Sequence, residues 1–241
     1  MEIKAWKPAR RDVLKMSAAI GAGALLPSAS FAQAQLRTTP DQILGPFYPV
    51  GLTPNLSGDL TMLPGHVARA KGQLMVVTGR VLNRNGEPVR GARVEIWQAN
   101  AVGRYAHPSD TNTAPVDPDF EGFGVALSDA DGRYRFKTIK PAAYPTGPTT
   151  FRPAHIHFDV SGRQDRLVTQ MYFDGDPYND KDRFLQSLRQ PERLIVKLQP
   201  ARADVDPDAM VAAFDIVLGE APPGRIQELR SGRWSHVVRL A

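Results

Sequence analysis

Short runs of β-branched and aromatic residues recur along the chain from about residue 74 onward, and turn-forming residues separate them at close spacing. This pattern is typical of a β-sandwich or a barrel, and no long helical period interrupts it. We therefore predict an all-β fold, a β-sandwich with long loops and little helix. The expected strands are 74–82, 92–97, 132–138, 154–160, 167–173, 193–198 and 214–218.

The connections between these strands differ in length. The Asn-Gly pair at 85–86 and the Asp-Gly pair at 131–132 are hairpin-type turn signals, because these residues tolerate the positive φ of tight turns. Residues 98–125 and 139–153 form long connections rich in proline and glycine, and 174–192 is expected to carry a little helix. Long loops on a rigid sheet are where function usually resides, so we expect the functional site beneath these two loops.

The amino-terminal segment is organised like an export signal. Basic residues precede a weakly apolar run over 16–26, and Pro27 and small residues follow it. The run is shorter than the ~20 apolar residues of a membrane-spanning helix, so no membrane anchor is expected. Arg10-Arg11 resembles a twin-arginine signal, and an ordinary basic leader is the alternative. We predict that residues 1–34 are a twin-arginine-type signal peptide and that the mature chain is exported to the periplasm.

The remaining chain is expected to hold one domain. Residues 35–72 form an extended N-terminal arm, 73–219 the β-sandwich domain, and 220–241 a tail to which we assign no role. Roughly 200 residues are enough to bury one good core. The chain has no cysteine, which excludes a disulfide framework and a thiolate metal site.

The basic character of the chain comes mainly from the expected signal. The formal net charge is +5, and residues 1–34 contribute five basic and two acidic residues to it. The rest of the chain holds 25 basic and 23 acidic residues, a net charge of +2. This balance gives no electrostatic reason to expect a nucleic-acid partner.

Two histidines on one expected strand are the first sign of chemistry. Alternate residues of a strand share a face. The apolar residues beside them must face the core, so His155 and His157 project together from the opposite face. A single histidine on a strand is usually a surface or hydrogen-bonded residue, and this structural reading stays open. Two imidazoles at this spacing beneath two long loops equally suit a metal site.

Further ligands would have to come from the loops, because no carboxylate-rich motif adjoins the histidine pair. Tyr105 lies in the first long loop and Tyr144 in the second. A phenolate is a hard anionic donor, and two of them with two imidazoles suit a ferric ion better than Zn(II) or Cu(I). For either tyrosine taken alone, packing or a hydrogen bond is the alternative role.

Several motifs, in order along the chain, resemble those of a known family. They are GPF at 45–47, IWQAN at 96–100, GRY at 103–105, TIKP at 138–141, YP at 144–145, RPAHIHF at 152–158, TQMYF at 169–173 and GDP at 175–177. Together they are similar to the intradiol ring-cleavage dioxygenases, most closely to the beta chains of protocatechuate 3,4-dioxygenase, over about residues 39–218. The fold of that family, a β-sandwich with iron held at one side, agrees with the strand pattern.

The resemblance implies a role for individual residues. The ligands of a non-haem Fe(3+) ion would be Tyr105, Tyr144, His155 and His157. The catalytic residues would be Arg152, Gln170 and Tyr144, the last as the ligand that the substrate displaces and that acts as a base. The residues in contact with the substrate would be Trp97, Gly45, Pro46 and Thr146.

The resemblance also implies the reaction and the partners. The expected reaction inserts both atoms of O2 into a catecholic aromatic, with intradiol cleavage to a cis,cis-muconate-type product. Arg152 would supply a fixed cation as negative charge shifts onto the ring. Thr146 and Phe151 stand where the beta chains typically carry tryptophan, so the pocket is expected to be wider. We expect a homo-oligomer, with an alpha-type partner chain as the alternative.

A non-catalytic binding module is the rival interpretation. The stretches 79–94 and 131–136 are similar in style to transthyretin-like modules, which bind or space without catalysing. Fold alone does not separate the two classes. The two tyrosines and two histidines favour the enzyme, because a spacer module has no use for such a set.

Overall fold

The computed structural model describes residues 35–51, 56–163, 165–201, 206 and 208–219. The predicted signal peptide and the 220–241 tail therefore lie outside the described residues. Within the described ranges, no helix is both long enough and apolar enough to span a bilayer.

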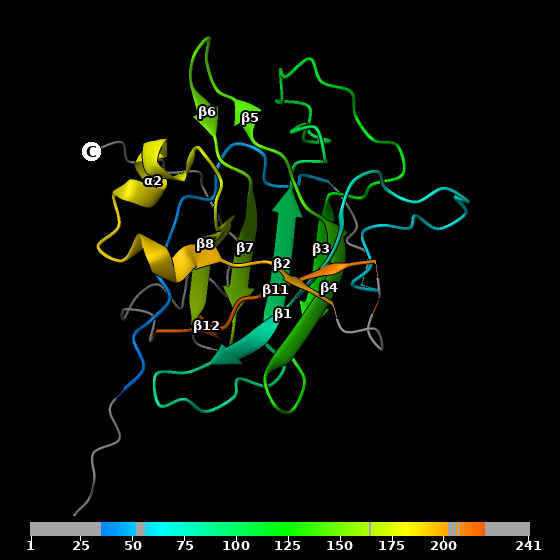
Figure 1. Ribbon diagram of the computed structural model, residues 1–241. Helices are drawn as coiled ribbons and strands as arrows, with labels where there is room; N and C mark the ends of the chain where they lie inside the picture. Colours follow the sequence, from blue (N-terminus) through cyan, green and yellow to red (C-terminus); the bar gives the residue numbers. More distant parts are fainter. Residues whose placement is uncertain (1–34, 52–55, 164, 202–205, 207, 220–241) are drawn as a thin grey trace, which may run out of the picture. The chain divides into compact units, whose positions relative to one another are not determined.

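Two five-stranded sheets form the layers of a sandwich (Figure 1). In the first sheet, β1 (Leu74–Leu82) pairs antiparallel with β4 (Arg133–Ile139) and parallel with β11 (Met210–Ala213) and β12 (Ile216–Val217), and β10 (Gln199–Pro200) extends it beyond β11. The second sheet has the order β3 (Phe123–Leu127), β2 (Arg93–Gln98), β7 (His155–Ser161), β8 (Arg166–Phe173) and β9 (Ile195–Val196). The predicted all-β sandwich is confirmed.

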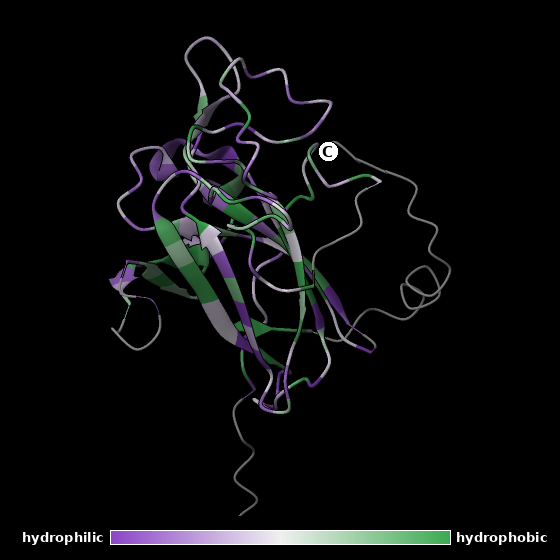
Figure 2. Ribbon diagram, turned by 90° about the vertical axis from the view of Figure 1, so that its right-hand side faces the viewer, coloured by the Kyte–Doolittle hydropathy of each residue, from purple (hydrophilic) through white to green (hydrophobic). Residues whose placement is uncertain are grey.

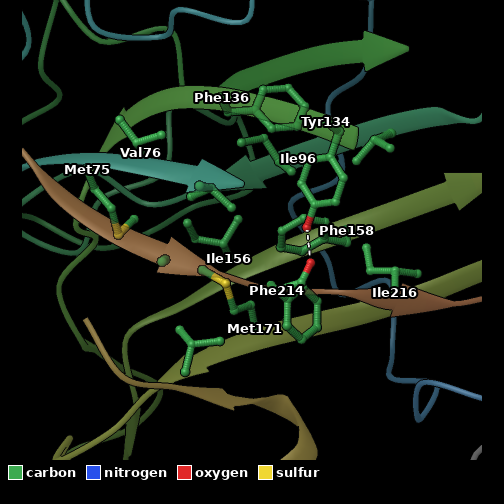
Figure 3. Packing of buried hydrophobic residues seen from close by; sticks show 14 of the residues in the cluster. Met75, Val76, Ile96, Tyr134, Phe136, Ile156, Phe158, Met171, Phe214 and Ile216 are labelled. Atoms are coloured by element: carbon green, nitrogen blue, oxygen red, sulfur yellow. Dashed lines mark hydrogen bonds between the residues drawn. The ribbon is translucent and has the colours of Figure 1, made fainter. Parts of the chain in front are cut away.

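Apolar side chains from both sheets meet in one core (Figure 3). Phe136 of the first sheet and Ile156 and Phe158 of the second are fully buried there. The hydroxyl of Tyr134 donates to the carbonyl oxygen of Phe214 at 2.6 Å, so the buried phenol has a partner. Figure 2 shows the underlying alternation as bands of hydrophobic and hydrophilic residues along the strands.

Phe158 is expected to be a large contributor to stability. Its ring lies 5.2 Å from that of Phe214 and 6.2 Å from that of Tyr134, in a core without solvent contact. Phe158→Ala should lower the free energy of unfolding by about 3–5 kcal/mol, because it removes buried surface and leaves a cavity. Leu127→Ala is the control, since Leu127 is 66% exposed. Urea denaturation measures both, and similar losses in the two variants would contradict the assignment.

Most predicted strands are present, with ends shifted by at most one residue. In place of the predicted strand 193–198, the structure has a 3₁₀ turn at Pro191–Leu194 followed by the two-residue strand β9. In place of the predicted strand 214–218, it has the two-residue strand β12. Two longer strands were missed, β3 and β11, and so were the two-residue strands β5 (Tyr144–Pro145), β6 (Phe151–Arg152) and β10. The turn at 131–132 has the expected positive φ at Gly132, but it joins β3 to β4 across the two sheets and so closes no hairpin within either.

The described residues of the 35–72 arm pack against the domain. Leu60 and Ala70 are buried in the core. Farther upstream, the backbone N–H of Gln42 donates to Val168 O of β8 at 2.8 Å, and the Thr169 hydroxyl donates to Pro40 O at 2.7 Å. The first part of the arm, blue in Figure 1, thus runs along β8 of the second sheet.

A small hairpin stands at the end of the sandwich where β7 begins (Figure 1). Its strands β5 (Tyr144–Pro145) and β6 (Phe151–Arg152) pair only with each other among the described strands. The predicted helical segment beyond β8 holds a 3₁₀ turn at Asn179–Lys181 and one turn of helix, α2 (Arg183–Gln186). Phe151 of the hairpin stacks on Tyr178 at 5.0 Å between ring centroids, which joins the two segments.

Candidate active site

Strand β7 places His155 and His157 side by side, as the alternation predicted. Their Nε2 atoms lie 3.2 Å apart, and each side chain is about 2% exposed. Ile156 between them points into the core. The imidazoles therefore face the loops and the arm, which bury them.

Both imidazoles are neutral, and His155 is in the tautomer that leaves Nε2 able to bind a metal. Nδ1 of His155 lies 2.8 Å from Pro153 O, and because a carbonyl only accepts, this nitrogen carries the proton and Nε2 keeps its lone pair. Burial, reinforced by the nearby charge of Arg152, lowers the pKa of His155 and of His157 well below the usual range. The pair is thus neutral at physiological pH.

Tyr105 reaches the histidines from a loop held by its own polar side chains. The amide side chain of Asn100 accepts from the backbone N–H of Arg104 at 2.9 Å, and Asp110 accepts from the N–H of Tyr105 at 2.7 Å. The Tyr105 hydroxyl comes to 3.5 Å from His155 Nε2. The sequence analysis did not identify Asp110, because the sequence does not show which backbone N–H a loop aspartate will bind.

Tyr144 reaches the histidines from the β5–β6 hairpin, which packs against the Tyr105 loop. Its ring centroid lies 5.6 Å from that of Tyr105 and 5.6 Å from that of His155. Gly103 makes this approach possible, because a Cβ there would lie 2.6 Å from Ala143 O and 3.0 Å from Tyr144 Cβ. Any larger residue at 103 would push the two tyrosine loops apart.

Both tyrosine hydroxyls hold their protons strongly. Burial, followed by the proximity of Tyr144, raises the pKa of Tyr105 well above its usual value. Burial likewise raises the pKa of Tyr144, against the opposing effect of Arg152. A phenolate would therefore form here only beside a strong positive charge such as a metal ion.

The four side chains fit a hard metal ion. The described residues contain no group of three or more His, Asp or Glu side chains that could hold a metal, so tyrosine oxygens must complete any site built on the histidine pair. Two neutral imidazoles and two phenolic oxygens are a nitrogen and oxygen donor set of the kind that suits ferric iron. Nδ1 of His157 is buried without a hydrogen-bond partner among the described residues.

The predicted substrate-contacting residues Trp97 and Gly45 both pack against His157. The Trp97 ring stacks on the imidazole with centroids 4.7 Å apart and planes 7° from parallel. Gly45 has φ +77°, and a Cβ there would lie 3.0 Å from His157 Cε1. The arm can therefore approach the imidazole this closely only with glycine. Phe47, two residues on, lies 4.6 Å from the Tyr105 ring and was missed in the sequence.

The other two predicted contacts lie farther out. Pro46 is exposed on the arm. Thr146 is exposed in the turn of the β5–β6 hairpin, where its hydroxyl pairs with that of Thr150 at 3.1 Å. The structure brings neither into contact with the imidazoles, and their role toward a substrate stays a prediction.

Arg152 lies beside the tyrosines and histidines and is itself 7% exposed. It is the cross-strand partner of Tyr144 in the β5–β6 hairpin. Nε donates to Asp182 Oδ2 at 2.8 Å, and Nη2 donates to Gln170 Oε1 at 2.7 Å and to the Tyr172 hydroxyl oxygen at 3.0 Å. Arg152 and Gln170, both predicted to be catalytic residues, are therefore joined by a direct hydrogen bond.

Gln170 joins this network to the arm. Its Nε2 donates to Ile43 O at 2.9 Å, which orients the amide so that Oε1 faces Arg152. The Tyr172 hydroxyl also donates to that oxygen, at 2.9 Å. Tyr172 was missed as a site residue, although its place two residues after Gln170 on the same strand face was a signal that could have found it.

Two other histidines have polar partners of their own. His66 pairs with Asp119 at 2.8 Å on the surface. His107 accepts from the Ser109 N–H at 3.1 Å, and its ring lies 5.8 Å from that of Phe47. Neither contact involves the His155 and His157 pair, so both histidines are tied to local structure.

Comparison with known proteins gives a consistent family. A family model described as Dioxygenase matches residues 43–220. The protocatechuate 3,4-dioxygenase beta chain of Burkholderia cepacia is 47% identical over 169 residues, which cover 68% of this chain and 72% of that protein. Catechol 1,2-dioxygenase of Acinetobacter baylyi is 36% identical over 188 residues, covering 72% of this chain and 57% of that protein.

Solved structures agree with the sequence matches. The crystal structure of catechol 1,2-dioxygenase from Pseudomonas arvilla C-1 is similar with a TM-score of 0.64 at 30% identity, covering 83% of this chain and 66% of that one. A dioxygenase domain from Streptomyces sp. SirexAA-E has a TM-score of 0.58 at 27% identity and is covered over its whole length. The matched range 43–220 contains all the tyrosines, histidines and polar residues of the site.

Proposed function

The chain belongs to the intradiol ring-cleavage dioxygenases and is an enzyme of that kind, and from this premise we propose that it uses a non-haem iron(III) ion. The proposed ligands are Tyr105, Tyr144, His155 and His157. The proposed reaction inserts both atoms of O2 into a catecholic aromatic and yields a cis,cis-muconate-type product. The non-catalytic module is set aside, because the relatives are enzymes.

The observation that carries the iron proposal is the convergence of the histidine pair and Tyr105. Two buried neutral Nε2 atoms lie 3.2 Å apart, with a phenolic oxygen 3.5 Å from one of them. If these side chains only filled space, apolar residues would stabilise the fold better, because burying polar atoms without good partners costs free energy. An iron(III) ion bound there would supply Lewis-acid chemistry that makes the ring of a bound catecholate reactive toward O2.

The two tyrosines are proposed to have different roles. Tyr105 is tethered through its backbone to Asp110 in a loop with many internal hydrogen bonds. Tyr144 sits on a two-stranded hairpin, and such hairpins are marginally stable by themselves. We therefore assign Tyr144 as the residue that moves aside for the substrate, its Oη accepting a catechol proton.

Arg152 is proposed to stabilise charge on the substrate ring. Its Nε and Nη2 are held by protein groups, whereas Nη1 has no hydrogen-bond partner among the described residues. A guanidinium held on two sides and free on the third is a preorganised donor for negative charge. Gln170 and Tyr172 hold it in that orientation.

Spectroscopy and oxygen uptake test the proposal together. The iron-loaded protein should be red-brown, because phenolate-to-iron(III) charge transfer absorbs in the visible, and it should consume O2 with catechol or protocatechuate. Tyr105→Phe should shift or bleach the band. A colourless protein with stoichiometric zinc and no oxygen uptake would refute the iron assignment.

We also propose export through the twin-arginine route, in which the chain folds and binds its metal before it crosses the membrane. The support is the Arg10-Arg11 pair ahead of a short apolar run. Arg10→Lys combined with Arg11→Lys should leave uncleaved precursor inside the cell, as seen by immunoblotting of cell fractions. Normal export of this double variant would point to the general secretion route.

For assembly, we propose a homo-oligomer that needs no second type of chain. Light scattering of the purified chain, with oxygen uptake on the same sample, tests this. Activity that appears only after an alpha-type chain is added would contradict it.

A further inference from the structure

Asp182 is a buried carboxylate whose two oxygens serve different elements. It precedes α2 and is 2% exposed. Oδ1 accepts from the backbone N–H of Phe184 at 2.8 Å and of Leu185 at 3.4 Å, which caps the helix. Oδ2 accepts from Arg152 Nε at 2.8 Å. One side chain thus links the end of a helix to the active-site guanidinium.

The first turn of α2 also supports the plane of that guanidinium. Arg152 Cζ lies 4.7 Å from the centroid of the Phe184 ring, within the range of a cation–π contact. Asp182 and Phe184 therefore fix one edge and one face of Arg152, and Gln170 with Tyr172 fix a second edge. The remaining nitrogen, Nη1, has no hydrogen-bond partner in the described part of the chain and can therefore bind another group.

A carboxylate is the one small side chain that can both cap α2 and pair with the Arg152 guanidinium. An asparagine has a single acceptor oxygen, so it can either cap α2 or face Arg152 Nε, and its NH2 group would then oppose the other donor. A serine can cap the helix but carries no charge to pair with the buried guanidinium. Breaking a buried pair leaves an uncompensated charge, which then seeks other partners.

We propose that Asp182 is a positioning residue for ring cleavage, which acts through Arg152 by aiming Nη1 at the substrate. This role rests on the proposed function of Arg152. Without Asp182, the guanidinium keeps its bonds to Gln170 and Tyr172 but is free to pivot about them. A displacement of about 1 Å in a catalytic group can cost on the order of a hundredfold in rate.

The test measures steady-state oxygen uptake with catechol for Asp182→Asn and Asp182→Ser, each alone and combined with Arg152→Ser. Each single variant should bind iron, keep the visible band and lose on the order of tenfold to a hundredfold in kcat, with a smaller change in KM. In the Arg152→Ser background neither should lower kcat further, because the group that Asp182 positions is gone.

Asp159→Asn is the matched control. Asp159 is another buried carboxylate paired with an arginine, through Oδ1 and Arg166 Nε at 2.8 Å, but its partner is not Arg152. Asp159→Asn should change the melting temperature by about as much as the Asp182 variants do. Its kcat should stay within about twofold of the wild-type value, because general destabilisation does not move an active-site group.

Three results would overturn the proposal: unchanged kcat in both single variants, losses that add in the Arg152→Ser background, or an equal kcat loss in Asp159→Asn. Loss of iron or of the folding transition in both single variants would likewise show that Asp182 is only structural. Oxygen uptake by the wild-type protein tests the proposed function independently of the role of Asp182. If the wild-type protein consumes no O2, the proposed function is wrong, whatever the Asp182 variants do.

Discussion

His155→Ala and His157→Ala should each abolish iron retention and with it all oxygen uptake. Each variant removes one of two converging Nε2 donors from a site that has no spare ligand among the described residues. Replacing even a residue that only supports a ligand typically costs 10- to 100-fold in metal affinity, so loss of a ligand should cost more than about 100-fold. Iron analysis after dialysis against a chelator, together with the visible spectrum, measures the effect.

His66→Ala is the control for the histidine variants. His66 pairs with Asp119 at the surface, so its removal should leave iron content and colour unchanged. Full iron content in either His155→Ala or His157→Ala would remove that histidine from the ligand set. Loss of iron in His66→Ala would show that metal loss reports general damage to the fold.

Arg152→Ser should keep iron and visible colour while kcat falls on the order of a hundredfold or more, the scale seen when one preorganised donor is removed. The guanidinium touches neither imidazole by a hydrogen bond, and a permanent cation cannot be a metal ligand. Its removal should therefore affect the chemical step and spare metal binding. Oxygen uptake and iron analysis of the same sample separate the two effects.

Arg152→Lys should rescue this loss only in part. An ammonium carries the charge but lacks the planar fork that reaches Asp182 and Gln170 at once. An unchanged kcat with a raised KM in Arg152→Ser would show a simple substrate anchor. Loss of iron in that variant would show that Arg152 is needed for the fold of the site.

Local patterns were sufficient for the strands and for the face of the histidine pair. Strand β1 has the predicted bounds, and the alternation along β7 placed His155 and His157 opposite the core because side chains on a strand alternate strictly. Where the local signal was weak, prediction failed. Strand β11 is short and forms its ladder with β1, about 135 residues earlier, so its pairing partner decides its structure.

The sequence by itself determined the all-β class, the histidine face and, through motifs, the family and its ligand candidates. Only the tertiary structure decided what surrounds them. Asp182 and Tyr172 meet Arg152 because the β5–β6 hairpin, β8 and the start of α2 converge, and no spacing along the chain encodes that meeting. The close approach of Gly45 in the arm to His157 arises for the same reason. Contacts between segments distant in sequence follow from packing, whereas periodicity reports only which way each residue of one strand points.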